Sequence, residues 1–143
     1  GILHDVTQAL LPQEQLKLCD ECGMLYSDFE GKNGKLLHAK TGAAVAARVF
    51  GESREVCEAI RWHTTGRANM TTLEKIIYLA DYMEPNRDFP GVEKLREAAE
   101  TSLDAAMILG LEMSIAQLRE RGRSIDPNSQ AALDFFQERT KEK

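Results

Sequence analysis

The hydrophobic and polar positions of this chain follow a helical pattern. Alternating runs of β-branched residues are absent, and Ala, Leu, Glu, Lys, Gln and Arg, which favour helices, dominate. The pattern predicts an all-α fold. We expect helices at residues 2–7, 12–23, 36–50, 54–63, 71 to beyond 81, 92–121 and 127–138, with loops at residues 26–34 and 86–89.

Helix-start signals precede several of these segments. A side chain that can accept a hydrogen bond from the first turn, or a proline in that turn, marks where a helix begins. The signals are Pro12, Ser53, the capping box Thr71-x-x-Glu74 and the pair Asp126-Pro127. They fix the expected starts more firmly than the ends.

The bulk composition is that of a water-soluble globular protein. The 143 residues are 43% hydrophobic and 29% charged, which predicts one domain over residues 1–143. No apolar run approaches the length needed to cross a membrane, so we expect no membrane partner. The net charge of −5 argues against non-specific binding of nucleic acid.

The cysteines are three in number, which argues against a disulfide framework and for a reducing, cytoplasmic location. Cys19 and Cys22 form a single Cys-x-x-Cys pair without the second pair that a structural zinc site usually has. We interpret this pair as structural or incidental.

The candidate chemistry lies in the histidines and two aspartates. The chain has three histidines, His4, His38 and His63, and each lies in an apolar segment or at the end of a predicted helix. Asp5 follows His4 directly, and Asp81 is the one acid in the apolar stretch 76–81. A buried carboxylate without a partner is costly. A shared centre of two divalent metal ions would satisfy all five groups, because imidazole and carboxylate ligands suit iron, manganese and zinc.

Simpler interpretations exist for each residue by itself. A single buried histidine is more often a hydrogen-bonded core residue than a metal ligand. Asp81 can pair with Lys75 or Arg87 instead of a metal.

Four stretches of the chain resemble the HD superfamily of metal-dependent phosphohydrolases, whose pattern is H…HD…H…H…D. More narrowly, they resemble the YqeK-type family of symmetrical diadenosine tetraphosphate hydrolases. The four stretches are residues 1–7, 37–43, 59–66 and 70–87. The resemblance covers the chain up to about residue 106.

The resemblance implies an all-α HD-domain helical bundle and a set of site residues. It implies that His4, Asp5 and Asp81 bind a first metal, and that Asp5 bridges to a second metal held by His38 and His63. The implied catalytic residues are therefore Asp5, His38 and His63, and the implied substrate-binding residues are Thr64, Gly66 and Arg87. For Arg87, an ion pair with Glu84 or Asp88 is an equally open interpretation.

The activity that the resemblance implies is hydrolysis of diadenosine tetraphosphate to two ADP by a metal-activated water. Two divalent ions would assist, iron first and manganese, zinc or magnesium as alternatives. The open alternatives are an HD phosphohydrolase of another nucleotide or phosphate ester, and a non-catalytic nucleotide-binding helical module. A homodimer through the long C-terminal helices is a further expectation.

The chain departs from the family pattern in two places. The family has an earlier histidine on a helix before the His-Asp pair, and the sequence begins too late to contain it. We therefore expect this chain to lack the N-terminal helical segment of the bundle. Many HD proteins also have a lysine three residues after the Asp, where this chain has Gln8.

Overall fold

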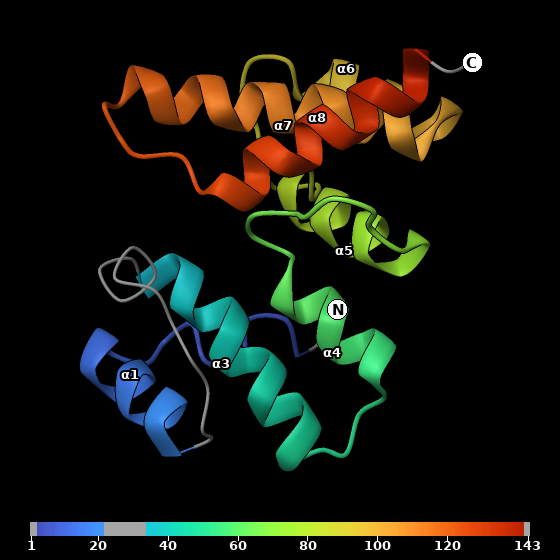
Figure 1. Ribbon diagram of the computed structural model, residues 1–143. Coiled ribbons are helices and arrows are strands. Elements are labelled where there is room, and N and C mark those ends of the chain that lie inside the picture. The colour runs from blue at the N-terminus through green and yellow to red at the C-terminus, as the bar shows by residue number, and fades with distance from the viewer. Residues whose placement is uncertain (1–2, 22–33, 142–143) are drawn as a thin grey trace. The chain divides into compact units, whose positions relative to one another are not determined.

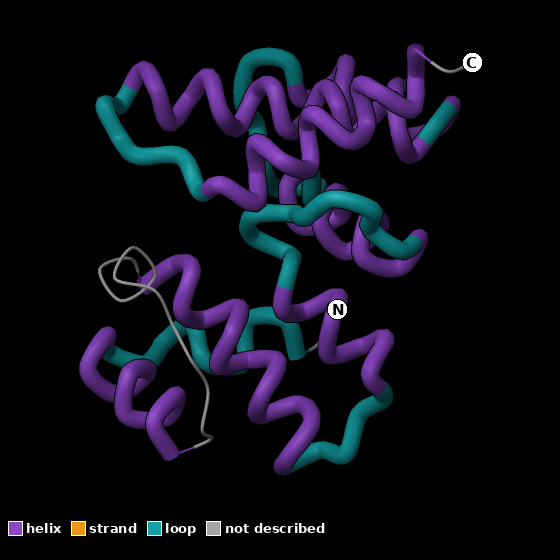
Figure 2. Tube along the Cα trace, in the orientation of Figure 1, coloured by secondary structure: helices purple, strands orange, loops and turns teal. Residues whose placement is uncertain are grey.

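The computed structural model describes residues 3–21 and 34–141. Within these ranges the chain forms seven helices and no strand (Figure 1, Figure 2). The helices are α1 (Pro12–Glu21), α3 (Gly34–Arg48), α4 (Arg54–Arg61), α5 (Thr72–Tyr82), α6 (Val92–Thr101), α7 (Leu103–Glu120) and α8 (Pro127–Lys141). The predicted all-α class is confirmed.

The chain divides into two compact units, Gly1–Thr64 and Thr65–Lys143. The first contains α1, α3 and α4, and the second contains α5 to α8. The expectation of one domain over the whole chain stays a prediction.

The first unit is organised around α3, which packs against both α1 and α4. Ala43 and Ala46 of α3 are buried against Ile60 of α4. Gly42 lies at a close approach: a Cβ there would be 3.3 Å from Ile60 Cγ2 and 3.5 Å from the carbonyl oxygen of His4. Small residues on this face therefore let α4 and the His4 segment come close to α3.

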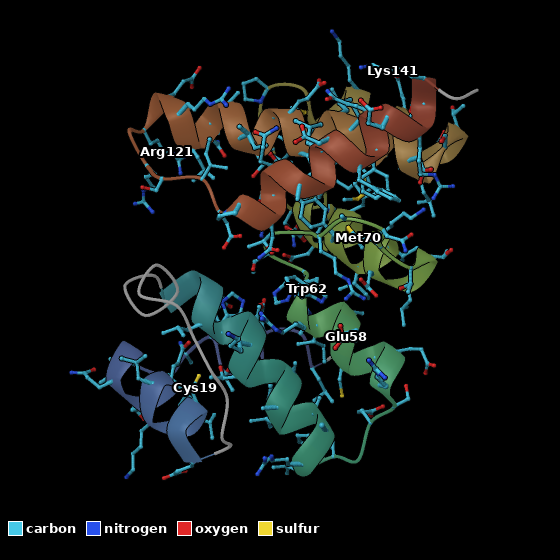
Figure 3. The ribbon with its side chains drawn as sticks, viewed as in Figure 1. Cys19, Glu58, Trp62, Met70, Arg121 and Lys141 are labelled. Atoms are coloured by element: carbon cyan, nitrogen blue, oxygen red, sulfur yellow. The ribbon has the colours of Figure 1, made fainter. Side chains whose placement is uncertain are left out.

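The end of α4 is held by an aromatic contact. The indole N–H of Trp62 donates to Glu58 Oε2 at 3.0 Å, and the Arg61 guanidinium lies 4.5 Å from the Trp62 ring centroid (Figure 3). These contacts fix the residue that immediately precedes His63.

The second unit has a larger apolar core, in which α7 packs against α5, α6 and α8. Its side chains come from all four helices and include Leu79, Leu95, Met107, Leu111 and Phe136, each almost fully buried. This core supports α5, the helix that carries Asp81.

The predicted helix starts are confirmed where the structure describes them. The Ser53 side chain accepts from the Val56 N–H at 3.3 Å, and Thr71 Oγ1 accepts from the Glu74 N–H at 3.2 Å. Helix α1 begins at Pro12 and α8 at Pro127. These helix starts could therefore be predicted from local capping residues, without knowledge of tertiary contacts.

Three predicted elements were wrong in extent or type. Residues 3–7 of the predicted first helix form turns, and the predicted helix 54–63 ends at Arg61, so His63 lies beyond it. The predicted helix 92–121 is two helices, because Ser102 has an extended backbone and its side chain caps α7 through the Ala105 N–H at 3.2 Å. The predicted helix end at Gly23 and most of the loop 26–34 lie outside the described residues, and Gly34 already belongs to α3.

Candidate metal centre

The His4-Asp5 pair lies in a series of tight turns before α1. The Val6 N–H donates to the Leu3 carbonyl at 3.2 Å, and the Gln8 N–H donates to the Asp5 carbonyl at 3.0 Å. These bonds span three residues rather than the four of an α-helix, which explains why the expected helix is absent. The turns direct the Asp5 side chain toward α3 and the end of α4.

One oxygen of Asp5 meets two histidines. Asp5 Oδ1 lies 3.0 Å from His38 Nε2 and 3.4 Å from His63 Nε2, and the two Nε2 atoms are 3.1 Å apart. His38 comes from α3 and His63 follows α4, so three separate segments of the first unit supply the group. Their ligand atoms all lie within 4.8 Å of one another, as a single ion requires.

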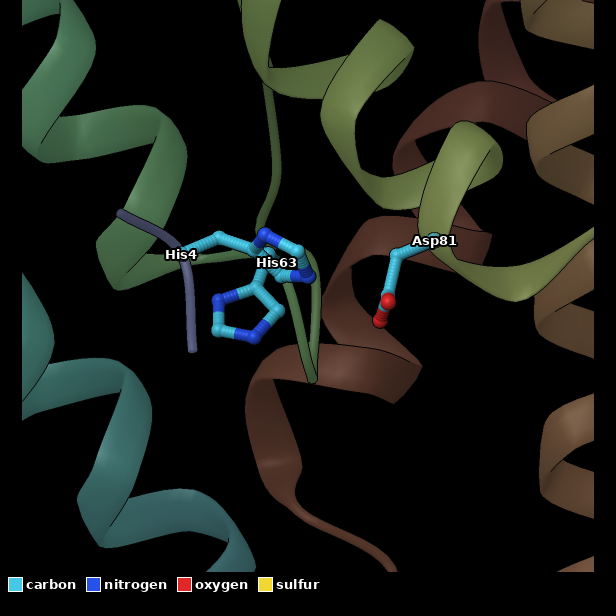
Figure 4. A group of neighbouring side chains, drawn as sticks. All are labelled: His4, His63 and Asp81. Carbon is cyan, nitrogen blue, oxygen red and sulfur yellow. The ribbon is translucent and has the colours of Figure 1, made fainter. Parts of the chain in front are cut away.

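The other oxygen of Asp5 meets the third histidine. Asp5 Oδ2 lies 3.2 Å from His4 Nε2. The His4 ring also packs edge-on against His63, with centroids 5.1 Å apart and planes at 89° (Figure 4). The carboxylate therefore separates the histidines into one beside Oδ2 and two beside Oδ1.

The backbone orients the ring of His63. Its Nδ1 lies 2.5 Å from the carbonyl oxygen of Ile60, which can only accept a hydrogen bond, so the proton belongs on Nδ1. The Nε2 atom of the same ring then points toward Asp5 and His38. Metal-binding histidines commonly have this arrangement, with the outer nitrogen donating to a carbonyl.

These donors fit a divalent cation. His38 and His63 are buried, whereas the Asp5 side chain is about one-third exposed at 36%, so the group is reachable from solvent on the carboxylate side. Imidazole nitrogens and a carboxylate oxygen converge at this point. A first-row divalent ion would satisfy all three donors at once.

Among the remaining predicted site residues, Asp81 and Arg87 belong to the second unit. Asp81 lies near the end of α5, where Figure 4 draws its side chain, and its Oδ1 is 3.9 Å from Arg87 Nη2. Two ion pairs were predicted as alternatives for Asp81, one with Lys75 and one with Arg87. The structure contains the pair with Arg87, whereas Lys75 pairs with Asp104 at 2.6 Å. The charge of Arg87 is thus directed to Asp81.

The predicted substrate residues Thr64 and Gly66 flank the boundary between the units. Thr64 is half-buried at the end of the first unit, and Gly66 is buried near the start of the second. Gly66 has φ of +73°, a conformation that favours glycine. A backbone turn therefore explains this glycine without a ligand.

Comparisons with known proteins identify the family. A model described as "HD domain" matches residues 1–86, more than half of the chain. The chain belongs to the HD-domain family. The resemblance inferred from the His-Asp pattern is confirmed, and HD membership implies divalent-metal binding, for which Asp5, His38 and His63 supply a fitting donor set.

Two curated relatives of this chain carry the name "Bis(5'-nucleosyl)-tetraphosphatase, symmetrical". The protein from Halalkalibacterium halodurans is 47% identical over 82% of this chain and 60% of its own length. The protein from Bacillus subtilis is 37% identical over 90% of this chain and 69% of its own length. The chain thus spans about two thirds of the length of these relatives.

A solved structure shows the same fold. A chain described as a predicted HD superfamily hydrolase involved in NAD metabolism, from Clostridium acetobutylicum, superposes with a TM-score of 0.93 at 36% identity. The match covers 97% of this chain and 74% of that chain. The expected HD-domain fold is therefore confirmed.

Some supporting residues of the HD site were missed from the sequence. The Ile60 carbonyl orients His63, and the Thr7 hydroxyl donates to the His38 carbonyl at 2.9 Å. Neither residue type signals such a role, because a carbonyl is present in every residue and threonine is common. Their contribution depends on which segments meet in the folded unit.

The described helices do not fit the requirements of a membrane span. Among residues 3–21 and 34–141, none of the helices has the length and apolar character needed to cross a bilayer.

Proposed function

We propose that this HD-domain chain hydrolyses diadenosine tetraphosphate symmetrically, releasing two ADP. Two observations support the proposal. The chain shares the HD family with relatives that are named symmetrical bis(5'-nucleosyl)-tetraphosphatases. It also brings histidine nitrogens and a carboxylate together as a metal-hydrolase site needs.

The observation that carries the proposal is that the two carboxylate oxygens of Asp5 face different histidines: Oδ2 faces His4, and Oδ1 faces His38 and His63. In the proposed site Oδ2 of Asp5 and His4 would help to hold a first divalent ion, and Oδ1 of Asp5, His38 and His63 would hold a second. The distances of 3.2 Å on one side, and 3.0 and 3.4 Å on the other, agree with that division. Asp81 is assigned to the first ion by the family resemblance alone.

When bound, the ions would supply charge neutralisation for the phosphate oxygens and would lower the pKa of a coordinated water. The side chains position them. The Ile60 carbonyl keeps the His63 proton on Nδ1, and Asp5 offers one oxygen to each side. Phosphoryl transfer depends mainly on positioning and charge stabilisation, so no side-chain nucleophile is required.

For substrate binding we propose Thr64, Gly66 and Arg87. Arg87 is the strongest of the three, since its half-exposed guanidinium can leave Asp81 to meet phosphate oxygens. We further propose iron as the preferred ion, with manganese, zinc or magnesium as substitutes, a cytoplasmic location and a homodimer.

The test is product analysis with the chain and diadenosine tetraphosphate in the presence of Fe²⁺ or Mn²⁺, under exclusion of oxygen. We expect ADP as the sole nucleotide product. Asp5→Asn and His38→Ala should reduce the rate by about 100-fold or more, because metal polarisation supplies several kcal/mol of transition-state stabilisation. Asp134→Asn, an exposed carboxylate on α8, is the matched control and should retain the wild-type rate.

Three other outcomes would contradict the proposed activity or favour one of its alternatives. ATP and AMP as products would contradict symmetrical cleavage. Turnover of mononucleotides or cyclic nucleotides without turnover of diadenosine tetraphosphate would support the alternative substrates. Absence of bound metal and of any turnover would support the non-catalytic binding module.

A further inference from the structure

A hydroxyl group links the two segments that carry Asp5 and His38. Thr7, two residues after Asp5, donates from Oγ1 to the main-chain carbonyl of His38 at 2.9 Å. The two residues are 31 positions apart in the sequence. The link therefore fixes the Asp5 turn onto α3 at the residue that supplies the neighbouring ligand.

The same hydroxyl has a second partner on α3. Thr7 Oγ1 and Thr41 Oγ1 are 2.6 Å apart, and Thr41 Oγ1 can also donate to the Leu37 carbonyl at 3.0 Å. Thr41 Oγ1 also lies 3.4 Å from the His38 carbonyl oxygen, so two hydroxyl protons serve four contacts, and Thr7 takes part in two of them. Thr41 has an acceptor on its own helix, whereas the Thr7 contacts join separate segments.

The turn is fixed on its other side as well. Gln15 of α1 donates through Nε2 to the Thr7 carbonyl at 3.4 Å and to the Leu10 carbonyl at 3.1 Å. Thr7, Gln15 and Thr41 are at most 3% exposed. Buried hydrogen bonds of this kind are not exchanged for water, so they hold a backbone more firmly than surface bonds do.

The turn that contains His4 lies close to α3 at Gly42. A Cβ on Gly42 would lie 3.5 Å from the His4 carbonyl and 3.7 Å from Thr7 Oγ1, both ordinary contact distances. The backbone of the His4 turn therefore rests directly on α3 beside Thr41.

From these contacts we infer that the Thr7 hydroxyl is a positioning group for the metal centre, holding Asp5 Oδ1 at His38 Nε2 before an ion binds. The inference rests on the proposed metal site. A preformed donor set binds more tightly because less ordering is needed on binding. Groups that orient metal ligands typically change metal affinity by about 10- to 100-fold when they are removed.

Three variants separate this role from general packing. Thr7→Val keeps the side-chain shape and removes the hydroxyl, and it should fold, since His38 O retains its helical partner and Thr41 can donate to Leu37 O. Thr7→Ser keeps the hydroxyl and removes the methyl group. Thr41→Val is the matched control, because the substitution lies in the same buried cluster but leaves the Thr7–His38 bond intact.

The experiment is a titration of each metal-free full chain with Mn²⁺ alone, followed by electron paramagnetic resonance of free Mn²⁺, well below the unfolding temperature. We expect about 10-fold weaker binding for Thr7→Val and near wild-type binding for Thr7→Ser and Thr41→Val. Thermal unfolding of each metal-free chain, run alongside, verifies that all are folded.

Several results would overturn the inference. One is wild-type Mn²⁺ affinity in Thr7→Val. A second is a loss of affinity in Thr7→Ser equal to that in Thr7→Val, which would assign the effect to the methyl group. A third is an equal loss of affinity in Thr41→Val, which would assign the effect to packing. Absence of Mn²⁺ binding by the wild-type chain would overturn the proposed metal site together with this inference. Normal binding by the wild type with no effect of Thr7→Val would overturn this inference alone.

Discussion

His63 directs its Nδ1 atom at the carbonyl oxygen of Ile60, 2.5 Å away, and thereby turns its Nε2 toward Asp5 and His38. The backbone at the end of α4 thus orients the ring so that Nε2 faces the other two donors of the proposed site. One edge of the ring is therefore held by the backbone, and the other faces the proposed metal position.

Replacing His63 by asparagine separates these two roles. The shorter amide side chain would lie near the place of Nδ1 and can still donate to the Ile60 carbonyl, while nothing replaces Nε2. We expect His63→Asn to fold with a melting temperature close to that of the metal-free wild type, and to lose at least about 10-fold in Mn²⁺ affinity. Calorimetric titration measures this, and an unchanged affinity would remove His63 from the ligand set.

A buried carboxylate in the first turn of α5 supplies a stability prediction. Glu74 is almost fully buried and receives two bonds from Arg67, at 2.8 and 2.9 Å, and a third from Thr71 at 3.0 Å. Arg67→Met would leave that charge poorly compensated. We expect a loss of about 2 kcal/mol in the free energy of unfolding, less than for a fully buried pair because Arg67 is 32% exposed.

Urea unfolding measures this loss, with Arg121→Met on the exposed end of α7 as the control. A loss for Arg67→Met no larger than that of the control would show that the pair contributes nothing. Glu74→Gln should recover part of the loss in the Arg67→Met background, because it removes the uncompensated charge.

The sequence predicted the parts of this molecule that depend on local chemistry. Ser53 and Thr71 mark helix starts through bonds within one turn, and Pro127 marks one because its φ is fixed and it lacks an N–H, so no tertiary information was needed. The histidine and Asp5 cluster was predictable because few residue types bind such metals, and the structure brings Asp5, His38 and His63 together.

The helices that were predicted wrongly depend on contacts with distant segments or on an interruption of the helical pattern of hydrophobic residues. Residues 3–7 of the predicted first helix form turns, whose backbone bonds span three residues, and the Thr7 hydroxyl bonds to a carbonyl of α3. Ser102 interrupts an otherwise helical pattern, and a serine is compatible with a helix interior as well as with a cap. The ligand role assigned to Asp81 is still a prediction.

Arg96 of α6 gives a prediction about the segment that follows α5. Its guanidinium donates to three main-chain carbonyls, those of Met83 at 3.3 Å, Glu84 at 3.1 Å and Arg87 at 3.1 Å. Arg96→Met should lower the free energy of unfolding by about 1–2 kcal/mol, since three carbonyls lose a charged donor. Because Arg87 lies in this segment, its amide should also exchange faster.

Hydrogen exchange read by mass spectrometry measures the second effect. Arg119→Met, an exposed arginine in the last turn of α7, is the control. Unchanged exchange over residues 83–87 in Arg96→Met would show that the segment is held by its own turns alone.

Tyr78 gives a pH-dependent prediction. Burial raises the pKa of its phenol above the ordinary value of 10, and the Ser114 hydrogen bond only partly opposes that rise. A pKa raised by folding means that the tyrosine contributes full stability below pH 10, and that this contribution falls as the pH rises toward the folded-state value. The free energy of unfolding should therefore decline above pH 10.

Tyr78→Phe should make that decline shallower. The variant also lacks the hydrogen bond to Ser114, so its free energy of unfolding at neutral pH should be lower than that of the wild type. The pKa of Tyr82 is raised by burial as well, so part of the decline should remain in the variant. Denaturant unfolding at intervals from neutral to alkaline pH compares the two slopes. Equal slopes would exclude Tyr78 as the titrating group.

The most direct test of the metal centre is an anomalous diffraction map of the chain crystallised with Mn²⁺ and recorded near the manganese absorption edge. We predict an anomalous peak coordinated by Asp5 Oδ1, His38 Nε2 and His63 Nε2, the three donors that already lie within 4.8 Å of one another. Bound manganese located only at other residues, or no peak at these donors at saturating Mn²⁺, would contradict the proposed site.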